Sequence, residues 1–329
     1  MLILTREDLK KAITMEDAID AIEIALKYFS TGKTKTPLRT VININEAKNE
    51  DIMSMPGYIE DMGAAVKLLS VFPGNYELGK ATISSIVAFF DDKTGEPLAL
   101  MDGGYLTAMR TGAISGVATK YLARKDSSIV AVIGAGIQAR TQLWAVCCVR
   151  DIKQVKVFDV SGERVDGFIK DMKDKFTDID FIKAESSDEA VKDSDIVLTA
   201  TTSTTPVFNV ESLKKGVHIN AIGSYTPKMQ ELPEGVFKIA GKVLVESVDA
   251  VVSEAGDFII PMEKGIFSKD NIHGELGDLV LGRITGRENT DEITLFKTVG
   301  IAVQDVACAA KIYDNARKMN LGQEIRLDA

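Results

Sequence analysis

The spacing of apolar residues near the start of the chain predicts a helix. From Met15 to Phe29, apolar side chains recur at intervals of three and four residues, which places them on one helical face. Thr14 is a good N-cap, with Asp17 three residues later, and Gly32 suits the position after the last turn. This helix is expected to be scaffold.

After this helix the pattern changes to short β-type runs. Strands are predicted over residues 39–44, 52–58, 64–72, 82–91 and 97–101, with a turn at 92–95 and a helix over 106–123. Strands joined by short turns pair with their neighbours, so we expect a mostly antiparallel sheet here. This sheet has more strand than one helix can cover, which indicates that another surface protects it.

From residue 129 onward, strands alternate with helices. Short apolar strands are predicted to open at Ile129, Val155, Phe181, Ile196, Val217 and Val243. This alternation predicts an α/β fold with a Rossmann-type doubly wound parallel sheet. A long helix over 299–319 follows, and its apolar face is expected to pack back on the first part of the chain. That part then becomes a discontinuous α+β domain of residues 1–120 and 300–329, with the Rossmann domain at 121–299.

A glycine motif follows the first strand of the predicted parallel sheet. Gly134, Gly136 and Ala139 form G-x-G-x-x-A between an apolar strand and a helix-like run. Gly134 permits the tight turn, Gly136 lets a pyrophosphate approach the backbone, and Ala139 lets the helix pack closely on the sheet. Asp159 ends the next strand, where a carboxylate accepts hydrogen bonds from a ribose 2′-hydroxyl and repels a 2′-phosphate. The expected cofactor is NAD, with NADH preferred, although Arg164 lies near enough in sequence to keep NADP open.

Composition narrows the class of protein further. The net charge of the chain is −9, which is a poor match for nucleic acid or an anionic membrane. No apolar run approaches the length of a membrane span and no signal peptide is apparent, so the cytoplasm is the expected location. Three cysteines and two histidines show no metal-ligand spacing, so no metal is expected, and His218 in an apolar strand is expected to be structural.

Two basic residues lie in unusually apolar surroundings. Lys67 is inside a strand that is otherwise apolar on both sides, where an ammonium is costly unless it meets an anion. An edge-strand lysine that reaches water is the alternative interpretation. Arg110 lies in a helix of small residues and suits a carboxylate or phosphate held bidentately. Arg39 is a weaker candidate for the same site, since it also fits a surface loop.

The chain resembles the ornithine cyclodeaminase/μ-crystallin family over nearly its whole length. The matching segments are MPGY at 55–58, VKLLSVFPGN at 66–75, GEPLALMDG at 95–103, LTAMRTGAISG at 106–116, VIGAGIQAR at 132–140, NAIGSYTPKMQEL at 220–232, GELGD at 274–278 and FKTVGIAVQD at 296–305. The family contains cyclodeaminases, alanine dehydrogenases, imine reductases and a lens protein. The resemblance therefore implies the fold and the type of cofactor, and leaves the reaction open.

The resemblance also implies roles for individual positions. Those for the substrate carboxylate and its surroundings are Arg39, Lys67, Arg110, Met53 and Val299. Those near the cofactor are Thr82, Arg110, Thr111, Gly134, Gly136, Ile137, Gln138, Asp159, Thr199, Thr201, Ile222, Gly223, Ser224 and Thr298. It further implies a homodimer built through the first domain.

Two positions depart from the family pattern. Tyr225 stands where cyclodeaminases carry an aspartate, and Met53 stands near where ornithine-specific members carry an acid. A neutral phenol cannot hold an ammonium, although it can donate a proton to a forming amine. Cyclodeamination is thereby weakened, unless a carboxylate such as Glu231 or Asp305 enters the site.

The residues and the resemblance together predict an NAD(P)H-dependent oxidoreductase. Its expected reaction is reduction of an α-imino acid, a ketimine such as Δ1-pyrroline-2-carboxylate, or interconversion of an amino acid and its 2-oxo acid. Lys67 and Tyr225 are the candidate proton donors, besides water. One alternative is an ornithine cyclodeaminase, which forms proline and ammonia with catalytic NAD. The other is a cofactor- or ligand-binding protein without turnover.

Overall fold

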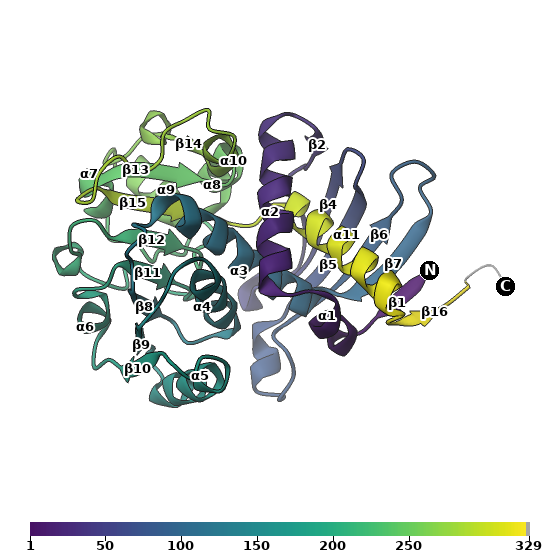
Figure 1. The fold of residues 1–329 in the computed structure, drawn as a ribbon, viewed down its shortest axis with the longest axis horizontal. Coiled ribbons are helices and arrows are strands. Elements are labelled where there is room, and N and C mark those ends of the chain that lie inside the picture. The colour runs from purple at the N-terminus through teal and green to yellow at the C-terminus, as the bar shows by residue number, and fades with distance from the viewer. Residues whose placement is uncertain (327–329) are drawn as a thin grey trace. The chain divides into compact units, whose positions relative to one another are not determined.

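The computed structural model describes residues 1–326, which fall into two compact units (Figure 1). The first unit contains Met1–Arg110 and the chain from Ile301 onward, and the second contains Thr111–Gly300. The division falls inside helix α3 (Gly103–Leu122). The first unit is therefore built from both ends of the chain.

The first unit is organised around an eight-stranded sheet. Its strands are β1 (Leu2–Leu4), β2 (Thr34–Lys35), β3 (Thr40–Asn45), β4 (Glu50–Ile59), β5 (Gly63–Val71), β6 (Ile83–Phe90), β7 (Pro97–Asp102) and β16 (Gln323–Glu324). They run in the order β16-β1-β7-β6-β5-β4-β2, with β3 also paired to β4. Every pair is antiparallel except β1 with β7, which confirms the predicted mostly antiparallel sheet.

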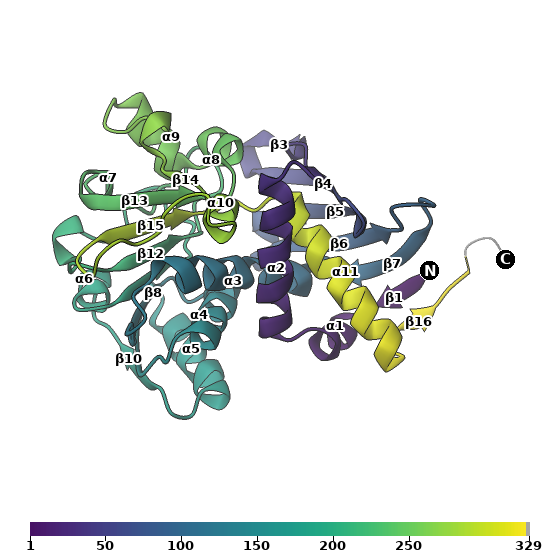
Figure 2. The same cartoon turned by 45° about the horizontal axis from the view of Figure 1, so that its top comes forward.

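Helices cover one face of this sheet. The helical segments of the first unit, besides the start of α3, are α1 (Arg6–Ala12), α2 (Met15–Ser30), α11 (Ala302–Met319), η1 (Glu46–Lys48) and η2 (Pro73–Tyr76). As predicted, Thr14 caps α2 in a capping box with Asp17. Helix α11, yellow in Figure 2, packs against α2 and against β4, β5 and β6. It begins three residues later than predicted, because Gly300 has a positive φ of 83° that an α-helix does not accept.

The second unit is organised around a parallel sheet. Its strands are β8 (Ile129–Ile133), β9 (Gln154–Phe158), β10 (Asp180–Lys183), β11 (Ile196–Thr199), β12 (His218–Ala221), β13 (Ala240–Val245), β14 (Gly274–Glu275) and β15 (Ile293–Lys297). Their order is β10-β9-β8-β11-β12-β15-β13-β14 and all pairs are parallel, which confirms the doubly wound fold. The sequence pattern missed β15, which inserts between β12 and β13.

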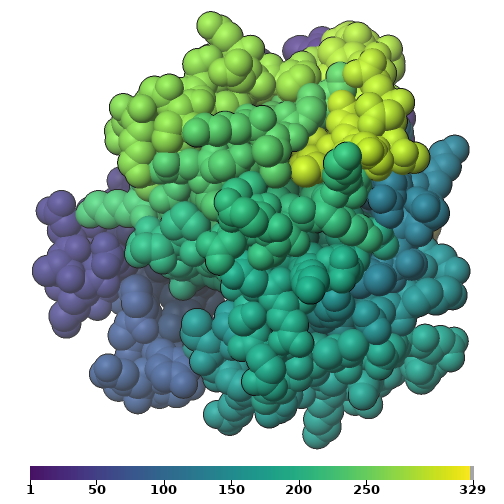
Figure 3. All heavy atoms as spheres, turned by 90° about the vertical axis from the view of Figure 1, so that its left-hand side faces the viewer, coloured from purple at the N-terminus to yellow at the C-terminus, as the bar shows by residue number. Residues whose placement is uncertain are grey.

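The remaining helices belong to the second unit, whose closely packed surface, in teal and green, fills most of Figure 3. They are α4 (Ile137–Val149), α5 (Gly162–Lys175), α6 (Ser187–Val191), α7 (Val236–Ile239), α8 (Val248–Glu254), α9 (Gly256–Glu263), α10 (Leu276–Val280), η3 (Val210–Ser212) and η4 (Lys269–Asn271). Within residues 1–326, no helix has both the length and the apolar character needed to cross a bilayer. His218 is fully buried beside the Thr294 hydroxyl (3.0 Å), and burial lowers its pKa to about 3, so it is a neutral core residue.

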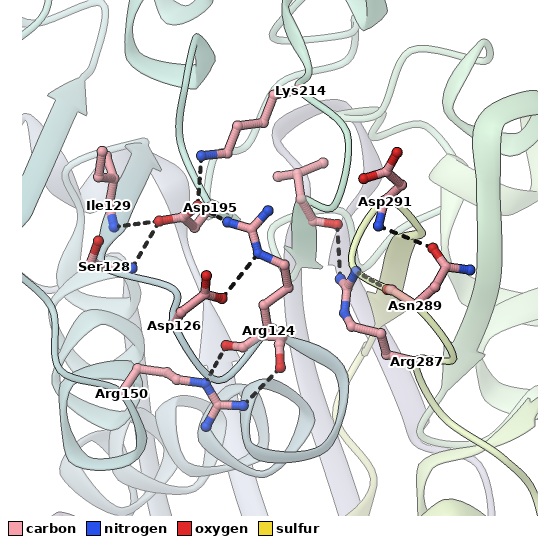
Figure 4. Close-up of polar contacts among 12 residues, drawn as sticks. Arg124, Asp126, Ser128, Ile129, Arg150, Asp195, Lys214, Arg287, Asn289 and Asp291 are labelled. Carbon is pink, nitrogen blue, oxygen red and sulfur yellow. Dashed lines mark hydrogen bonds and ion pairs between the residues drawn. The ribbon is translucent and has the colours of Figure 1, made fainter.

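Asp195 ties together the strands at the amino edge of the parallel sheet (Figure 4). It directly precedes β11, and its carboxylate accepts hydrogen bonds from the amides of Ser128 (2.8 Å) and Ile129 (3.0 Å), where β8 begins. Arg124 (2.5 Å) and Lys214 (2.6 Å) supply two cations to the same carboxylate. This buried anchor fixes the register of β8 with β11, and so fixes the opposite edge where the glycine motif lies.

Candidate functional site

The predicted cofactor positions of the second unit gather at one edge of its sheet. Gly134 follows β8, Asp159 follows β9, and Ile222 to Ser224 follow β12. Thr199 ends β11, Thr201 comes just after it, and Thr298 follows β15. Because all these strands are parallel, their carboxyl ends meet at the same edge. The strand order reverses between β8 and β11, and such a switch point is where open α/β sheets bind ligands.

Close packing requires the glycines of this edge. Gly134 has a φ of 93°, and a Cβ there would lie 2.7 Å from the Ala200 carbonyl oxygen. A Cβ on Gly223 would lie 2.2 Å from the Thr201 carbonyl oxygen. Gly136, by contrast, has open space where its Cβ would be, directly before α4. The backbone is therefore accessible at the position where a pyrophosphate approaches a helix N-terminus.

Asp159 braces the glycine loop. One carboxylate oxygen accepts a hydrogen bond from the Ala135 amide (2.8 Å) and the other accepts one from the Ser161 amide (2.9 Å). An ionised carboxylate has about four acceptor positions, so two remain for ribose hydroxyls. The same residue thus shapes the loop and places a negative charge where a ribose is expected.

Glu231 is the hub of the neighbouring loops. It is fully buried and accepts hydrogen bonds from the hydroxyls of Thr199 (2.8 Å) and Thr201 (2.8 Å). The amides of Thr201 (2.6 Å), Gly223 (2.7 Å) and Ser224 (3.2 Å) also donate to it. With its oxygens occupied by these donors, Glu231 holds the loops after β11 and β12 in place.

A buried ion pair that the sequence pattern did not predict lies next to Glu231. Asp257 accepts from the Glu231 amide (2.6 Å) with one oxygen and contacts Lys297 Nζ (2.8 Å) with the other. Both side chains are fully buried. Lys297 is the last residue of β15, a mainly apolar strand. A lysine in an apolar strand is the same sequence feature that pointed to Lys67.

Glu246 was also missed, and it holds the segment before α11. It accepts from the Thr298 hydroxyl and from the amides of Val299 (2.5 Å) and Gly300 (2.6 Å). Thr298 and Val299, both predicted site residues, are buried and fixed by this carboxylate. Tyr225 is half-buried in the loop after β12, where its neighbour Ser224 donates to the Met229 carbonyl (2.7 Å).

These residues fit a dinucleotide. The Gln138 side-chain oxygen, in the first turn of α4, is buried without a hydrogen-bond partner among the described residues. Ile137 beside it is 74% exposed although apolar. A buried acceptor and an exposed apolar side chain both gain a partner when a nucleotide covers the loop. Residues 1–326 hold no group of three or more His, Cys, Asp or Glu side chains suited to a metal ion.

The predicted carboxylate-binding residues of the first unit form a buried cluster. Lys67 lies on the helix-covered face of β5, between Met55 of β4 and Val87 of β6, and is 2% exposed. The alternative of a lysine that reaches water is therefore wrong. Arg110 is 7% exposed.

Two side chains of α11 meet these cations. Asp305 is 1% exposed, and its carboxylate contacts Lys67 Nζ (2.8 Å) and Arg110 Nε (3.3 Å). The adjacent Gln304 accepts a hydrogen bond from an Arg110 terminal nitrogen (2.9 Å). Asp305 was predicted only as an acid that could enter the site, and its pairing with both cations was not predicted.

The surroundings of Lys67 favour loss of its proton. Burial is the largest effect, and together with the like charges of Arg110 and Arg39 it lowers the pKa of Lys67 to about 8. Asp305 opposes them. Lys67 is therefore mostly protonated at neutral pH. It loses its charge as the pH rises through about 8.

The other predicted site residues differ in how near they lie to the Lys67 cluster. Arg39, which precedes β3, is half-buried and close enough to act on the charge of Lys67. Met53 is half-buried on β4, two positions from Met55 and so on the same face of the sheet as Lys67. Thr82 directly precedes β6 and is half-buried, and no hydrogen bond joins it to the cluster among the described contacts. Thr111 is the residue after Arg110 in α3.

Comparison with known proteins identifies relatives of the whole chain. The profile of the ornithine cyclodeaminase/mu-crystallin family matches residues 1–320. A Δ1-pyrroline-2-carboxylate reductase of Bacillus cereus is 41% identical over 326 residues, which cover 99% of each chain.

Two solved structures are also similar. Thermococcus litoralis Δ1-pyrroline-2-carboxylate reductase, in complex with NADH and L-proline, has a TM-score of 0.95 and 44% identity, covering 99% of this chain and 100% of that one. An archaeal alanine dehydrogenase dimer with bound NAD has a TM-score of 0.92 and 35% identity, covering 99% of both chains.

Proposed function

The chain belongs to the ornithine cyclodeaminase/mu-crystallin family, and from this premise we propose that it is an NADH-dependent reductase of Δ1-pyrroline-2-carboxylate, with L-proline as product. The relatives with the same reaction in their names match almost the full length of the chain. The family also contains other reactions, so the substrate must be argued from the residues of this chain.

The observation that carries the proposal is the unbalanced charge of the Lys67 cluster. Two buried cations, Lys67 and Arg110, meet one buried carboxylate, that of Asp305, which leaves one net positive charge. A buried charge without a counter-ion is costly, and a substrate carboxylate removes that cost. Half-buried Arg39 adds further attraction for an anion. The cluster therefore suits an α-imino acid, whose carboxylate lies next to the carbon to be reduced.

The reaction requires a hydride at the imine carbon and a proton at the nitrogen. NADH, when bound at the glycine loop, supplies the hydride. We propose that Lys67, Arg110 and Arg39 hold the carboxylate and so orient the C=N bond. The proton comes from the Lys67 ammonium or from the Tyr225 phenol.

The chain's carboxylates argue against ornithine cyclodeamination. That reaction needs an anion to steady an ammonium, and Tyr225 replaces the aspartate of the cyclodeaminases. Asp305 already contacts two cations, and Glu231 is occupied by hydroxyls and amides of its own unit. Neither carboxylate is placed to serve a second ammonium.

A substrate panel tests the proposed function. We expect NADH oxidation with Δ1-pyrroline-2-carboxylate, weaker oxidation with the six-membered cyclic imine, and little with pyruvate plus ammonia. Preference for the 2-oxo acid with ammonia would instead make the protein an amino-acid dehydrogenase. No oxidation with any of them would favour a binding protein without turnover.

Asp159 predicts the choice between the two nicotinamide cofactors. A 2′-phosphate beside its carboxylate brings like charges together, which costs several kcal/mol at close range. We therefore expect NADPH to bind at least about 100-fold more weakly than NADH in a fluorescence titration, since every step of about 1.4 kcal/mol is a factor of ten in the dissociation constant. Asp159→Ser should narrow the difference by weakening NADH and relieving the repulsion. Tighter binding of NADPH by the wild type would refute this role.

The uncovered face of the first unit predicts a homodimer. Leu68 and Ile86 are register partners on the face of the sheet opposite Lys67, and each is 44% exposed. Ile42 (59%) and Ile52 (40%) pair in the same way on the same face. Contiguous apolar surface of this kind marks an interface. We propose that a second copy of the chain covers it, as the dimer of the archaeal relative supports.

Light scattering measures this state directly. We expect twice the chain mass of 35.7 kDa for the wild type, and a shift toward one chain mass for Leu68→Glu. Ile239→Glu is the control, because Ile239 is equally exposed but lies in the second unit. A wild-type mass near 35.7 kDa at micromolar concentration would contradict the dimer.

A further inference from the structure

We propose that Asp305 is a positioning residue for imine reduction, which holds Lys67 and Arg110 in the arrangement that receives the substrate carboxylate and preserves the charge of the Lys67 ammonium. The inference rests on the proposed function for its catalytic meaning. Its effect on Lys67, however, is measurable without turnover.

The contacts of Asp305 support the first part of the proposal, that it holds Lys67 and Arg110 in place. Asp305 divides its two carboxylate oxygens between the two cations, 2.8 Å from Lys67 Nζ and 3.3 Å from Arg110 Nε. The preceding residue, Gln304, fixes another nitrogen of Arg110 at 2.9 Å. Two successive residues in the first turn of α11 thus hold side chains from β5 and α3.

The number of donors shows why this contact leaves the cations able to bind substrate. An ammonium has three N–H donors and a guanidinium has five. Asp305 accepts one hydrogen bond from Lys67, and Gln304 accepts one from Arg110. Asp305 faces Arg110 Nε at 3.3 Å as an ion pair without a hydrogen bond between the two atoms. Asp305 therefore orients the cations without neutralising them as a pair, since one positive charge remains.

The charged groups around Lys67 support the second part of the proposal, that Asp305 preserves the charge of the lysine. The groups that act on it are Asp305 from α11, Arg110 from α3 and Arg39 from the segment before β3. Its register partners on β4 and β6, Met55 and Val87, are apolar.

Cys308 also faces Asp305 and Arg110 from α11, and burial raises the pKa of its thiol, so it is neutral. Asp305 is thus the anion that offsets burial and two like charges at Lys67. Removing that anion lowers the pKa of Lys67 below about 8 and leaves the lysine neutral over more of the working pH range.

The test compares Asp305→Asn with the wild type over a pH series. The amide keeps the shape of the side chain and removes its charge. We expect the alkaline fall of kcat/KM to move to lower pH by about one unit, which corresponds to roughly a tenfold loss at pH values well above the wild-type midpoint. The loss should shrink as the pH falls and Lys67 regains its proton. Asp314→Asn is the matched control, because Asp314 is an exposed aspartate on the same helix. An unshifted alkaline limb in Asp305→Asn would overturn the proposal.

A second readout separates this inference from the proposed function. NMR of 13C-labelled lysine, with Lys67→Met to assign the signal, follows the charge of Lys67 in the resting protein. We expect its titration midpoint to be lower in Asp305→Asn than in the wild type and unchanged in Asp314→Asn. A wild type that reduces no imine would defeat the proposed function but leave this result standing. An unmoved Lys67 midpoint beside normal imine reduction would defeat the positioning role alone.

A further variant covers the case in which Asp305→Asn does not fold. Asp305→Glu keeps the charge and displaces it by one methylene. We expect its alkaline limb to stay close to that of the wild type while kcat falls, because the cations are then held in a different place. A wild-type kcat with Asp305→Glu would contradict the positioning role, since the contact distances would not matter.

Discussion

Lys67→Met is expected to lower kcat/KM for imine reduction by about 10²- to 10⁴-fold, the range usual for loss of a catalytic acid. Methionine fills nearly the same volume, so the change removes a cation and keeps the packing between Met55 and Val87. Arg110 still neutralises Asp305 in the variant, which limits the destabilisation. The remaining activity should also lose the alkaline limb that the pKa of Lys67, about 8, predicts for the wild type.

NADH affinity distinguishes this loss from a damaged fold. The glycine loop, Asp159 and the Glu231 hub all belong to the second unit, whereas Lys67 belongs to the first. The NADH dissociation constant of Lys67→Met should therefore match that of the wild type. Lys93→Met, at an exposed turn, controls for the loss of a lysine. Wild-type kcat/KM in Lys67→Met would reduce Lys67 to a structural residue.

Tyr225→Phe is expected to lower kcat by ~10- to 100-fold if the phenol delivers the proton, with little change in KM. The ring and its packing remain in this variant, and only the hydroxyl is lost. The loop should keep its shape, because Glu231 and Met229 hold the adjacent Ser224 through its amide and hydroxyl. Single-turnover kinetics in H₂O and D₂O would show whether a proton transfer has become slower.

Tyr76→Phe provides the comparison, since Tyr76 is 75% exposed. An unchanged kcat in Tyr225→Phe would assign the proton to Lys67 or to water. Single-turnover kinetics of Lys67→Met in H₂O and D₂O would then decide between Lys67 and water as the donor. If water is the donor, the solvent isotope effect should stay the same in Tyr225→Phe and in Lys67→Met.

Local patterns along the chain were sufficient to predict most elements. The capping box at Thr14, the antiparallel strands and the glycine loop at Gly134 all depend on residues close together in sequence. Long-range neighbours could not be predicted in this way. Lys67 and Asp305 are 238 residues apart, and their contact exists only because α11 packs on β5.

Lys67 and Lys297 show the limit of the rule that found the site. Both are buried lysines in apolar strands, and both meet a buried aspartate at 2.8 Å. A lysine in a predicted apolar strand was expected to meet an anion. Lys67 was found in this way because its strand was predicted, and Lys297 was missed because β15 was not predicted. Their charged neighbours differ: Lys297 lies beside two buried acidic residues, Asp257 and Glu231, whereas Lys67 shares Asp305 with a second cation. That difference is a property of packing and is absent from the local sequence.

Product stoichiometry tests the central proposal most directly. The purified protein is incubated with NADH and Δ1-pyrroline-2-carboxylate, and in parallel with NAD and L-ornithine, and proline, ammonia and cofactor are quantified. We predict one L-proline formed for each NADH consumed in the first reaction, and no proline or ammonia in the second. Proline and ammonia from L-ornithine, with NAD unchanged at the end, would contradict the account and identify a cyclodeaminase.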